Sequence, residues 1–600
     1  MLFSRHERTL TSRKIITLAN YSSISRITIM KWGLGMLLVL CLFACHSNNS
    51  KGADRVTAEE EVLSNEEKKP LIALGQLWGF LKYHHPAVAK GSYDWDMELM
   101  KIIPDVANAK KESEWKAILA NWVDSLPAVP ARVAKSAPLT DVLVKADYGV
   151  LFDTVYFEPR TIEKVKQILN NAHITTHHYV KSDGRGVPTF TNEQPYDEDP
   201  YPDYAHRLLS LYRYWNIINY FYPYRELCDQ KWCEVLGDRL PDFVNARDKY
   251  EYMLACLRLV TLLDDSHAFF SSRKYPGILF EWAGVFKVPF ETKFVEGQLV
   301  VTSYTSKDDK LKDKIKIGDV ITKVDGDSVK HILTRLLPYT PASNYGVKLR
   351  EIAKNVLRGN TSTVSLSISR GNESIEVEVE RRFLGNLDLP DYYNTQPGQK
   401  GYKIREDGIG YIFPANAKIE ERDQIPSYIQ RTKGLIVDLR CYPDDFFESK
   451  LMDYLNKTNV EYSEVSHGNF SYPGYFFMKR DAHKASFMPD VQNTYKYKVV
   501  VIVNEYTQSR AENTVMRLQT SPLVTVIGST TAGADGHVVS FDLPGGIQTS
   551  ITSLGVYYPD GADTQRVGIK IDEFVQPTIQ GIRDGRDELL ERAVQIIKEP

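Results

Sequence analysis

Ser509 has the setting that most suggests chemistry. It follows five consecutive β-branched residues at 499–503 and precedes an apolar-periodic segment at 511–518. This pattern predicts a strand buried on both faces, then a helix, with Ser509 on the turn between them. A hydroxyl there lies at the positive end of the helix dipole, near backbone N–H groups that can stabilise an oxyanion. We therefore consider Ser509 a candidate nucleophile, although Thr507 or Ser509 could equally cap the helix, with Glu512 completing a capping box.

The first element that must help to position this serine is a helical region at residues 71–275, which contains an internal repeat. The segment 77–86 matches the segment 214–223, 137 residues later, and the register then continues without a gap. Two Trp, two Pro and a Tyr in one register are poorly explained by chance. We expect two copies of one helical unit, joined by a mixed segment at 140–202 that lies over the surface.

His267 is the second candidate for chemistry. It follows Asp265 and Ser266 at the end of the second copy, whereas the equivalent stretch of the first copy, at 124–130, has no histidine. A lone histidine after a helix is often only a satisfied polar residue. A histidine that occurs in only one copy of a duplicated unit is, however, typical of a functional residue added to a structural scaffold. His267 is therefore a candidate base for Ser509.

Length and composition limit the possible classes of protein. The chain has 600 residues, which suggests three or four domains, and its 43% apolar and 25% charged residues are ordinary for globular protein. The formal net charge is −3 at pH 7 and no basic stripe stands out, which argues against nucleic acid as a partner. The sequence has no CxxC pair and no HExxH motif, so we expect no metal and no cofactor.

The N-terminal residues predict export. An apolar run at 33–44 follows Met30-Lys31-Trp32; it is about as long as a signal-peptide core and too short to span a bilayer. The run ends in Leu-Phe-Ala-Cys, which resembles the lipobox of bacterial lipoproteins, where the thiol, here that of Cys45, is acylated. An ordinary signal peptide with an incidental cysteine is the alternative.

From this resemblance we expect a signal segment at 1–45, with the true start at Met30, and a polar tether at 46–70. The protein would then be lipid-anchored in the bacterial cell envelope, as a periplasmic or outer-membrane lipoprotein. In an oxidising compartment Cys228 and Cys233 could form a local disulfide.

A smaller β-rich unit follows at 278–385. The segment 316–329 contains a Gly-Asp turn, then alternating apolar residues that lead into a tight Asp-Gly turn, a pattern that predicts a hairpin. Two more strand-like runs, 363–369 and 373–381, complete the unit. The segment resembles PDZ domains, which bind extended peptide by adding a strand to the edge of their own sheet. Another small barrel with the same turn is the alternative.

The last part of the chain, 395–600, alternates strands and helices. Strands are predicted at 408–412, 434–440 and 524–528 in addition to 499–503, with a helix at 422–430. This alternation predicts an α/β layer with a largely parallel sheet. The strand ends that carry Asp438, Arg440 and Ser509 would then meet at one edge, where such sheets place their sites. The overall expectation is a multidomain α+β protein.

The order of these motifs resembles the serine-peptidase family of C-terminal processing proteases and the tricorn core protease. The matching motifs are the PDZ-like unit, Gly-Leu-Ile-Val-Asp-Leu-Arg, Thr-x-Ser-x-Ala-Glu and Ile-Gly-x-x-Thr-Ala-Gly. The resemblance covers roughly 262–595 and implies an α/β core of the ClpP/crotonase type. It also implies that Ser509 is the nucleophile. Processing proteases pair this serine with a lysine where the present chain has Ala534, so a Ser-Lys dyad is not expected.

The tricorn-like branch uses a His preceded by Ser before the PDZ unit, which implies His267 as general base and Ser266 as a residue that helps to hold the ring. His537 is the alternative base. The oxyanion donors would be the backbone N–H of Arg510 and a second group in the loop after Arg440, which we assign to Tyr442.

Two departures from the family pattern affect this assignment. Pro443, in the loop that is Gly-rich in the family, has no N–H to donate. Gln565 occupies the position of the tricorn-branch Glu. We expect an exported, membrane-anchored serine endopeptidase that cleaves peptides or unfolded proteins. A catalytically inactive peptide-binding lipoprotein on a peptidase scaffold is the alternative.

Overall fold

The computed structural model describes residues 63–600, apart from 132–140, 390–399, 444–447 and the shorter gaps at 173, 175, 185, 308, 388, 486–487 and 491. The expected signal segment and Cys45 lie outside the described residues. Helix α2 (Asn65–His84) begins after its N-cap Ser64, and Glu67 completes a capping box there. The tether expected over 46–70 is therefore wrong for residues 65–70, because a capping box starts a helix at this point.

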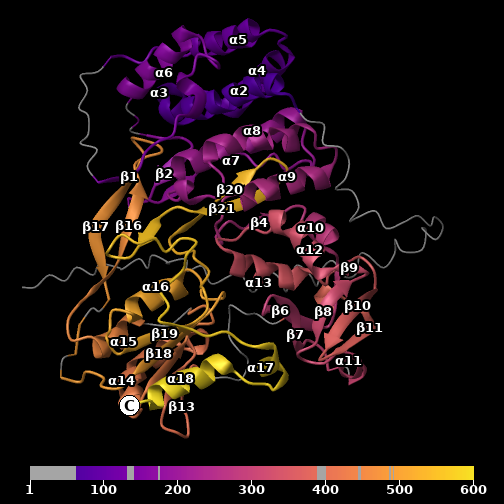
Figure 1. The fold of residues 1–600 in the computed structure, drawn as a ribbon. Coiled ribbons are helices and arrows are strands. Elements are labelled where there is room, and N and C mark those ends of the chain that lie inside the picture. The colour runs from indigo at the N-terminus through magenta and orange to yellow at the C-terminus, as the bar shows by residue number, and fades with distance from the viewer. Residues whose placement is uncertain are drawn as a thin grey trace, which may run out of the picture. The chain divides into compact units, whose positions relative to one another are not determined.

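Helices dominate the part of the chain that follows (Figure 1). Their bounds are α2, α3 (Pro86–Ala89), α4 (Trp95–Asn108), α5 (Glu112–Asp124), α6 (Pro159–Asn171), α7 (Tyr204–Phe221), α8 (Trp232–Val244) and α9 (Lys249–Thr261). Helices α8 and α9 begin 137 residues after α4 and α5, the same offset that relates the two sequence segments. The helices of the two expected copies thus begin at equivalent positions.

Equivalent tryptophan pairs occur in both halves of this region. Trp78 and Trp95 each donate the indole N–H to the other's backbone carbonyl, at 3.1 and 3.0 Å. Trp215 and Trp232 exchange the same two bonds at 2.9 and 3.0 Å. All four rings are buried. The exchanged hydrogen bonds therefore satisfy the indole N–H groups without water. This repeated arrangement supports the interpretation of two copies, which stays a prediction.

The segment between the two halves differs from the expected surface connection. Helix α6 places Ile162, Val165 and Ile168 in the same hydrophobic core as the tryptophans. Strand β1 (Val142–Val144) pairs with β17 (Phe476–Lys484) from the last part of the chain. The segment is therefore partly a structural element of the core, because its apolar residues recur at helical spacing.

The β-rich unit has a sheet in the order β11-β10-β8-β7-β6. Its strands are β6 (Phe290–Val295), β7 (Gln298–Tyr304), β8 (Val320–Val324), β9 (Asp327–Ser328), β10 (Thr363–Arg370) and β11 (Glu373–Glu380), with helices α12 (Val329–Leu336) and α13 (Tyr345–Asn355). Strand β9 pairs with β8 across a turn in which Asp325 and Gly326 both have positive φ, as an Asp-Gly hairpin requires. A separate hydrophobic core, which includes Val301, Ile321 and Leu366, holds the unit together.

A six-stranded sheet forms the last part of the chain, in the order β13-β14-β15-β18-β19-β23. The strands are β13 (Tyr402–Ile404), β14 (Gly410–Ile412), β15 (Leu435–Asp438), β18 (Val499–Val503), β19 (Val524–Gly528) and β23 (Glu573–Phe574). All neighbouring pairs are parallel except β13 with β14, which agrees with the expected α/β layer. The helix expected at 422–430 is instead a 3₁₀ turn, Ile419–Gln424, followed by α14 (Ile425–Ile429).

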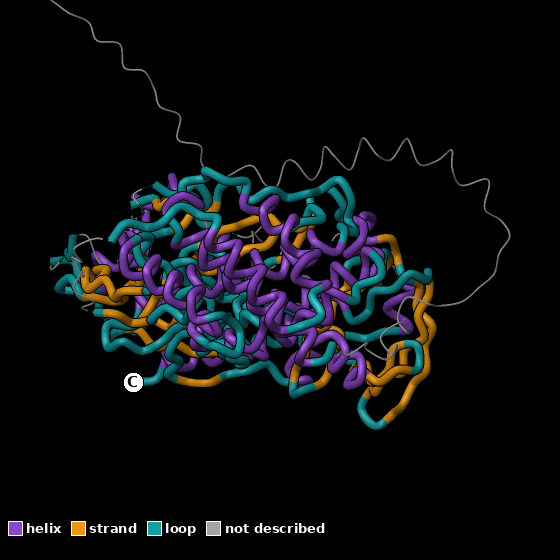
Figure 2. Tube along the Cα trace, turned by 90° about the horizontal axis from the view of Figure 1, so that it is seen from above, coloured by secondary structure: helices purple, strands orange, loops and turns teal. Residues whose placement is uncertain are grey.

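Two further sheets connect the helical region to this part of the chain. Strand β4 (Phe270–Ser272), just after His267, pairs with β21 (Ile547–Thr552), which pairs with β20 (Val538–Leu543). Strands β16 (Glu461–Gly468), β17 and β22 (Gly555–Tyr557) form the other sheet with β1. In Figure 2 strands lie on both sides of the helices at the centre of the view. Side chains of β20 and β21, such as Phe541 and Ile551, belong to the helical core, so the two regions share their packing.

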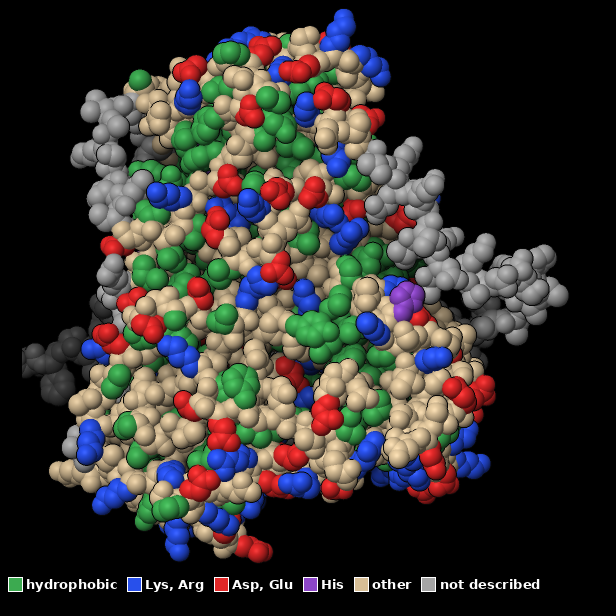
Figure 3. All heavy atoms as spheres, in the orientation of Figure 1, with side chains coloured by type: hydrophobic (Ala, Val, Ile, Leu, Met, Phe, Trp, Pro, Cys, Tyr) green, Lys and Arg blue, Asp and Glu red, His purple; other side chains and the backbone are tan. Residues whose placement is uncertain are grey.

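Among the described residues, no helix is both long enough and apolar enough to cross a membrane. Acidic and basic side chains are interspersed over the face shown in Figure 3.

Candidate active site

Ser509 lies on the turn between β18 and α16 (Arg510–Leu518), as the sequence predicts. Its φ of 57° and ψ of −121° fall in a region that residues with a side chain rarely adopt. Such a conformation persists only where the surrounding structure over-determines it, and it occurs preferentially at functional sites. A strained serine between a buried strand and a helix is also the arrangement of nucleophile elbows. The half-buried Ser509 is therefore held in the way a nucleophile requires.

The side chain of Glu512 holds this turn in place. Its Oε1 accepts hydrogen bonds from Thr531 Oγ1 at 2.6 Å and Gly533 N at 2.7 Å. Its Oε2 accepts from Ala534 N at 3.0 Å and Ser509 N at 3.2 Å. Burial raises the pKa of this carboxyl to about 7. Glu512 thus both contributes to a helix cap and ties the Ser509 turn to the loop 531–534, so the cap and nucleophile interpretations are compatible.

His267 lies in a tight turn between α9 and β4. Its Nδ1 is 2.8 Å from the hydroxyl of Thr552, at the end of β21. Its backbone N–H donates to Asp265 Oδ1 at 2.9 Å, and its carbonyl accepts a hydrogen bond from Ser550 Oγ. The ring is therefore fixed from the side of Nδ1, which leaves Nε2 as the nitrogen available for proton transfer.

The environment of His267 keeps its imidazole neutral near pH 7. Burial lowers its pKa below the usual value of about 6.5, and a charged His537 would lower it further, whereas Asp265 opposes the shift. Nε2 is buried and has no hydrogen-bond partner among the described residues. A neutral ring with an unoccupied Nε2 has the protonation state that a general base requires.

The turns that carry Ser509 and His267 are in direct contact. Gln508 Nε2 donates to the carbonyl of Ser266 at 3.3 Å, so the residue before each candidate touches the other turn. Ser509 Oγ is not bonded to Nε2 of His267. In an enzyme without substrate such bonds are often long and tighten on binding. The structure therefore brings the two turns together without a hydrogen bond between the two side chains.

Ser266 does not hold the imidazole, in contrast to the expectation from the family resemblance. Its hydroxyl accepts a hydrogen bond from Ser343 N at 2.9 Å and donates to Ala532 O at 3.4 Å. Its own N–H donates to Ser343 Oγ at 2.7 Å. Ser266 thus joins the turn before α13 to the loop 531–534, and the ring contact is made by Thr552.

Gln565 is also away from Nδ1 of His267. It is almost fully buried, and its Nε2 lies 3.5 Å from the hydroxyl of Tyr222. Its Oε1 is buried and has no hydrogen-bond partner in the part of the chain that the structure describes. The residue that follows, Arg566, has a φ of 68° and donates its N–H to Gly533 O at 2.8 Å. Gln565 therefore packs beneath the loop 531–534, and nothing places it on the ring of the base.

The expected oxyanion donors follow the neighbouring strands β18 and β15. Arg510 begins α16, so its backbone N–H is at the positive end of that helix. The half-buried Tyr442 and the buried Pro443 follow strand β15. Thr507 joins the two segments, because its hydroxyl donates to Leu439 O at 2.8 Å. Both segments therefore end at the same edge of the sheet.

Asp438 and Arg440, which the sequence places at this edge, form a structural ion pair. Arg440 binds Asp438 through Nε at 2.9 Å and Nη2 at 2.7 Å, and it also binds Asp587, the N-cap of helix α18 (Glu588–Lys598). Tyr411 donates to Asp438 at 2.8 Å. These groups are satisfied by one another, which favours a role in the packing of α18.

Cys228 and Cys233 are free thiols in this structure, so the disulfide considered for them is not formed. Cys228 Sγ instead donates to Leu263 O at 3.5 Å. Burial raises the pKa of Cys228 well above that of an ordinary thiol, which disfavours a reactive thiolate.

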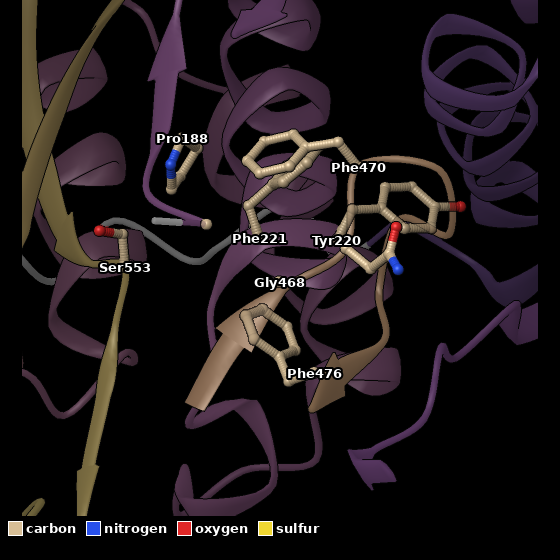
Figure 4. A pocket seen from close by; sticks show the side chains of 9 residues that line it. Pro188, Tyr220, Phe221, Gly468, Phe470, Phe476 and Ser553 are labelled. Atoms are coloured by element: carbon tan, nitrogen blue, oxygen red, sulfur yellow. The ribbon is translucent and has the colours of Figure 1, made fainter. Parts of the chain in front are cut away.

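A small cavity lies where α7 meets the β16–β17 hairpin, and Figure 4 shows the rings of Tyr220, Phe221 and Phe470 close to it. Its volume of about 10 Å³ leaves room for one water molecule. Ser553, which also lines the cavity, directly follows Thr552 and donates to His537 O at 2.9 Å. The cavity is therefore next to the site but too small for a peptide side chain.

Comparison with known proteins finds a family model that matches part of the chain. Residues 414–575 match the family model described as Peptidase family S41. This segment is similar to peptidase family S41. The resemblance to C-terminal processing proteases inferred from the sequence motifs is thereby confirmed.

Two curated S41 relatives are similar to part of the chain. The carboxy-terminal processing protease CtpA of Bacillus subtilis (strain 168) is 26% identical over 270 residues, which are 42% of this chain and 54% of that protein. A probable CtpA-like serine protease of Staphylococcus haemolyticus (strain JCSC1435) is 24% identical over 294 residues, 48% of this chain and 52% of that protein. The chain spans about half the length of the curated relatives it matches.

A solved structure of a CPAF mutant covers 66% of this chain and 98% of its own, with a TM-score of 0.50 and 14% identity. At this identity the likeness concerns the fold alone. The S41 segment 414–575 contains Ser509, Thr552 and Gln565, whereas His267 lies upstream of it. The assignment of the base therefore depends on the geometry of this chain.

Sequence analysis missed Thr552 as the partner of His267. The signal available was indirect, because β21 contains Thr549, Ser550 and Thr552, all of which are buried. Buried hydroxyls on a strand indicate polar partners on a neighbouring element, but the sequence does not tell which element that is.

Proposed function

We propose that this protein is a serine endopeptidase that cleaves peptides or unfolded proteins, with Ser509 as the nucleophile and His267 as the general base. The strained backbone of Ser509, at φ 57° between β18 and α16, carries the proposal. The neutral, buried His267 with an unoccupied Nε2 supports it.

In the first half of the reaction, Nε2 of His267 takes the proton of Ser509 Oγ while the oxygen attacks the carbonyl carbon of the scissile bond. The imidazolium then gives this proton to the leaving amine, and the acyl group remains on Ser509. In the second half, water loses a proton to Nε2 and attacks the ester. Ser509 recovers its proton from His267, and the product carboxylate leaves.

The oxyanion of each tetrahedral intermediate would be stabilised by the backbone N–H of Arg510 and by a group in the loop after Arg440, at Tyr442. The start of α16 supplies a favourable dipole at this point. Because Thr507 ties the turn to Leu439 O, both donors are held on the same edge of the sheet.

The β-rich unit would act as a PDZ-like domain that engages the substrate as an added strand. Its helix α13 touches the site directly, since Asn344, the N-cap of α13, donates to Thr531 O at 2.8 Å. Arg350, on the same helix, donates to Gln508 Oε1 at 3.3 Å. A substrate held on this unit would therefore lie close to the nucleophile.

From the sequence of the N-terminus we also propose that the protein is exported and lipid-anchored through Cys45 in the bacterial cell envelope. Several acyl chains on one cysteine give stable membrane attachment. Metabolic labelling with a palmitate analogue, compared between the wild type and Cys45→Ala, tests this part. Label on Cys45→Ala would contradict it.

The activity is tested with the soluble form that begins after Cys45, incubated with casein. Ser509→Ala and His267→Ala should abolish cleavage while they remain folded. Ser113→Ala, on the exposed side of α5, and His178→Ala, which is also exposed and outside the β-rich unit, serve as matched controls and should cleave as the wild type does.

Loss of cleavage in Ser509→Ala but not in His267→Ala would move the base elsewhere, with His537 the next candidate. A fluorophosphonate probe that labels Ser509 in the wild type would support the nucleophile independently of substrate choice. If the wild type neither cleaves casein nor takes the probe and binds peptide as well as both variants do, the inactive peptide-binding lipoprotein is the correct interpretation.

A further inference from the structure

We infer that Thr552 and Asp265 are the positioning residues of the base, in the place that a single carboxylate occupies in a Ser-His-Asp triad. The inference rests on the proposed role of His267. The observation that carries it is the 2.8 Å contact between Nδ1 of His267 and the hydroxyl of Thr552, in a buried setting.

The tautomer of His267 decides whether it can act. For Nε2 to accept the proton of Ser509, the neutral ring must carry its own proton on Nδ1. Thr552 Oγ1 has the lone pairs to accept a hydrogen bond from Nδ1–H. With the hydroxyl 2.8 Å away, this tautomer keeps its hydrogen bond, whereas the other tautomer leaves a buried Nε2–H without a partner. The contact therefore selects the reactive form.

Asp265 supplies the charge that Thr552 lacks. Its carboxylate is fully buried, with Oδ1 3.9 Å from Nδ1 of His267. This distance is too long for a hydrogen bond but short enough to stabilise an imidazolium in a buried site. A charged His537 would oppose that effect. Thr552 thus orients the imidazole ring, and Asp265 compensates the charge of the imidazolium.

The Asp265 carboxylate also binds the backbone of both Thr552 and His267. Asp265 Oδ2 accepts the N–H of Thr552 at 2.9 Å, and Oδ1 accepts the N–H of His267 at 2.9 Å. Strand β4, which follows His267, pairs with β21 through Phe270 and Thr549. These bonds fix the distance between the ring and the hydroxyl, as a preorganised site requires.

The test compares three variants of the soluble form in peptide cleavage. Thr552→Val removes the hydroxyl with little change in shape and should lower kcat about 10²-fold, because a misoriented base loses that much, while KM stays near the wild-type value. Thr552→Ser should restore most of kcat. The matched control is Thr549→Val, which removes another buried hydroxyl of β21, one that bonds Phe269 O rather than the ring. Unchanged kcat in Thr552→Val, or an equal loss in Thr549→Val, would overturn the inference.

A second measurement does not depend on peptidase activity. ¹⁵N spectra of histidine-labelled protein, with His267 assigned by His267→Ala, report the tautomer and the pKa of its ring. The wild type should be neutral and protonated at Nδ1, Thr552→Val should shift towards the Nε2–H form, and Asp265→Asn should lower the pKa. A wild-type ring protonated at Nε2 would refute the inference even if cleavage is confirmed, and the expected tautomer would uphold it even if no cleavage is found.

Discussion

Gln508 donates its side-chain amide to the carbonyl of Ser266 at 3.3 Å, across 242 positions of the chain. Each of these residues directly precedes one member of the proposed Ser-His pair. The contact therefore sets the separation of Ser509 and His267 through two backbones rather than through the reacting atoms.

This contact leads to the first prediction. Gln508→Leu keeps the volume of the side chain but removes the amide. The turns of Ser509 and His267 then lose the hydrogen bond that joins them. We expect kcat to fall about tenfold and the free energy of unfolding to fall by only about 2 kcal/mol, the usual net contribution of the two hydrogen bonds that the amide makes with Ser266 O and Arg350. Steady-state kinetics and urea unfolding measure the two effects. A large loss of stability with unchanged kcat would contradict this role.

The strain at Ser509 can be measured as stability. Glycine adopts a φ of 57° with a ψ of −121° without steric cost, whereas alanine retains the strain of serine. We expect Ser509→Gly to be more stable than Ser509→Ala by about 1 kcal/mol, although both lack the nucleophile. Urea unfolding of the two variants gives the difference. Equal stabilities would show that the turn is not strained.

The elements around Ser509 could be predicted because their local patterns are strong. The five β-branched residues 499–503 specify a buried strand, and Ala511, Val515 and Leu518 specify one face of a helix. The structure has these elements as β18 and α16. The position of Ser509 follows from these two elements, because the end of the strand and the start of the helix fix where the short connecting turn must lie.

The partner of His267 could not be predicted, because it depends on the pairing of strands far apart in sequence. Thr552 reaches Nδ1 only through the register of β21 with β4, in which Thr549 is opposite Phe270. A shift by one residue would turn every side chain of β21 to the other face. Gln565 was assigned by family position alone, and the positive φ of Arg566 turns the chain so that Gln565 packs against Tyr222 instead.

The contact between α13 and the site predicts a coupling between the β-rich unit and the catalytic loops. Asn344 caps α13 and also donates to Thr531 O, Ala532 O and Arg566 O, at 2.8, 3.2 and 3.2 Å. We expect Asn344→Ala to cost about 1 kcal/mol for the lost cap and, in addition, to lower kcat, because the loop 531–534 holds Ser509 N.

The control for this prediction is Ser328→Ala, which removes the N-cap of α12 in the same unit. Among the described residues the Ser328 hydroxyl bonds only to His331 N, so its loss should affect stability by a similar amount and leave kcat unchanged. An equal effect of both variants on kcat would show that Asn344 acts through the general stability of the unit and not through the loop.

The final prediction concerns pH and Glu512. Burial raises the pKa of Glu512 to about 7 from an ordinary value of 4.5, so between these values the folded protein binds more protons than the unfolded chain. Stability contributed through this group is then fully present below about pH 4.5 and is lost as pH rises through about 7. We expect the free energy of unfolding of the wild type to fall with pH across this window, by at most about 1.4 kcal/mol per pH unit from this group.

Glu512→Gln removes the titration while it keeps one oxygen for the donors of the loop, so the difference in unfolding free energy between wild type and variant isolates this group from Asp535, whose pKa burial raises to about 6. Urea unfolding at several values between pH 4.5 and 8 gives that difference. As pH rises, the unfolding free energy of the variant should increase relative to that of the wild type, because only the wild type must bury a charge. A difference that is constant with pH would mean that Glu512 is already ionised throughout, held so by its four donors.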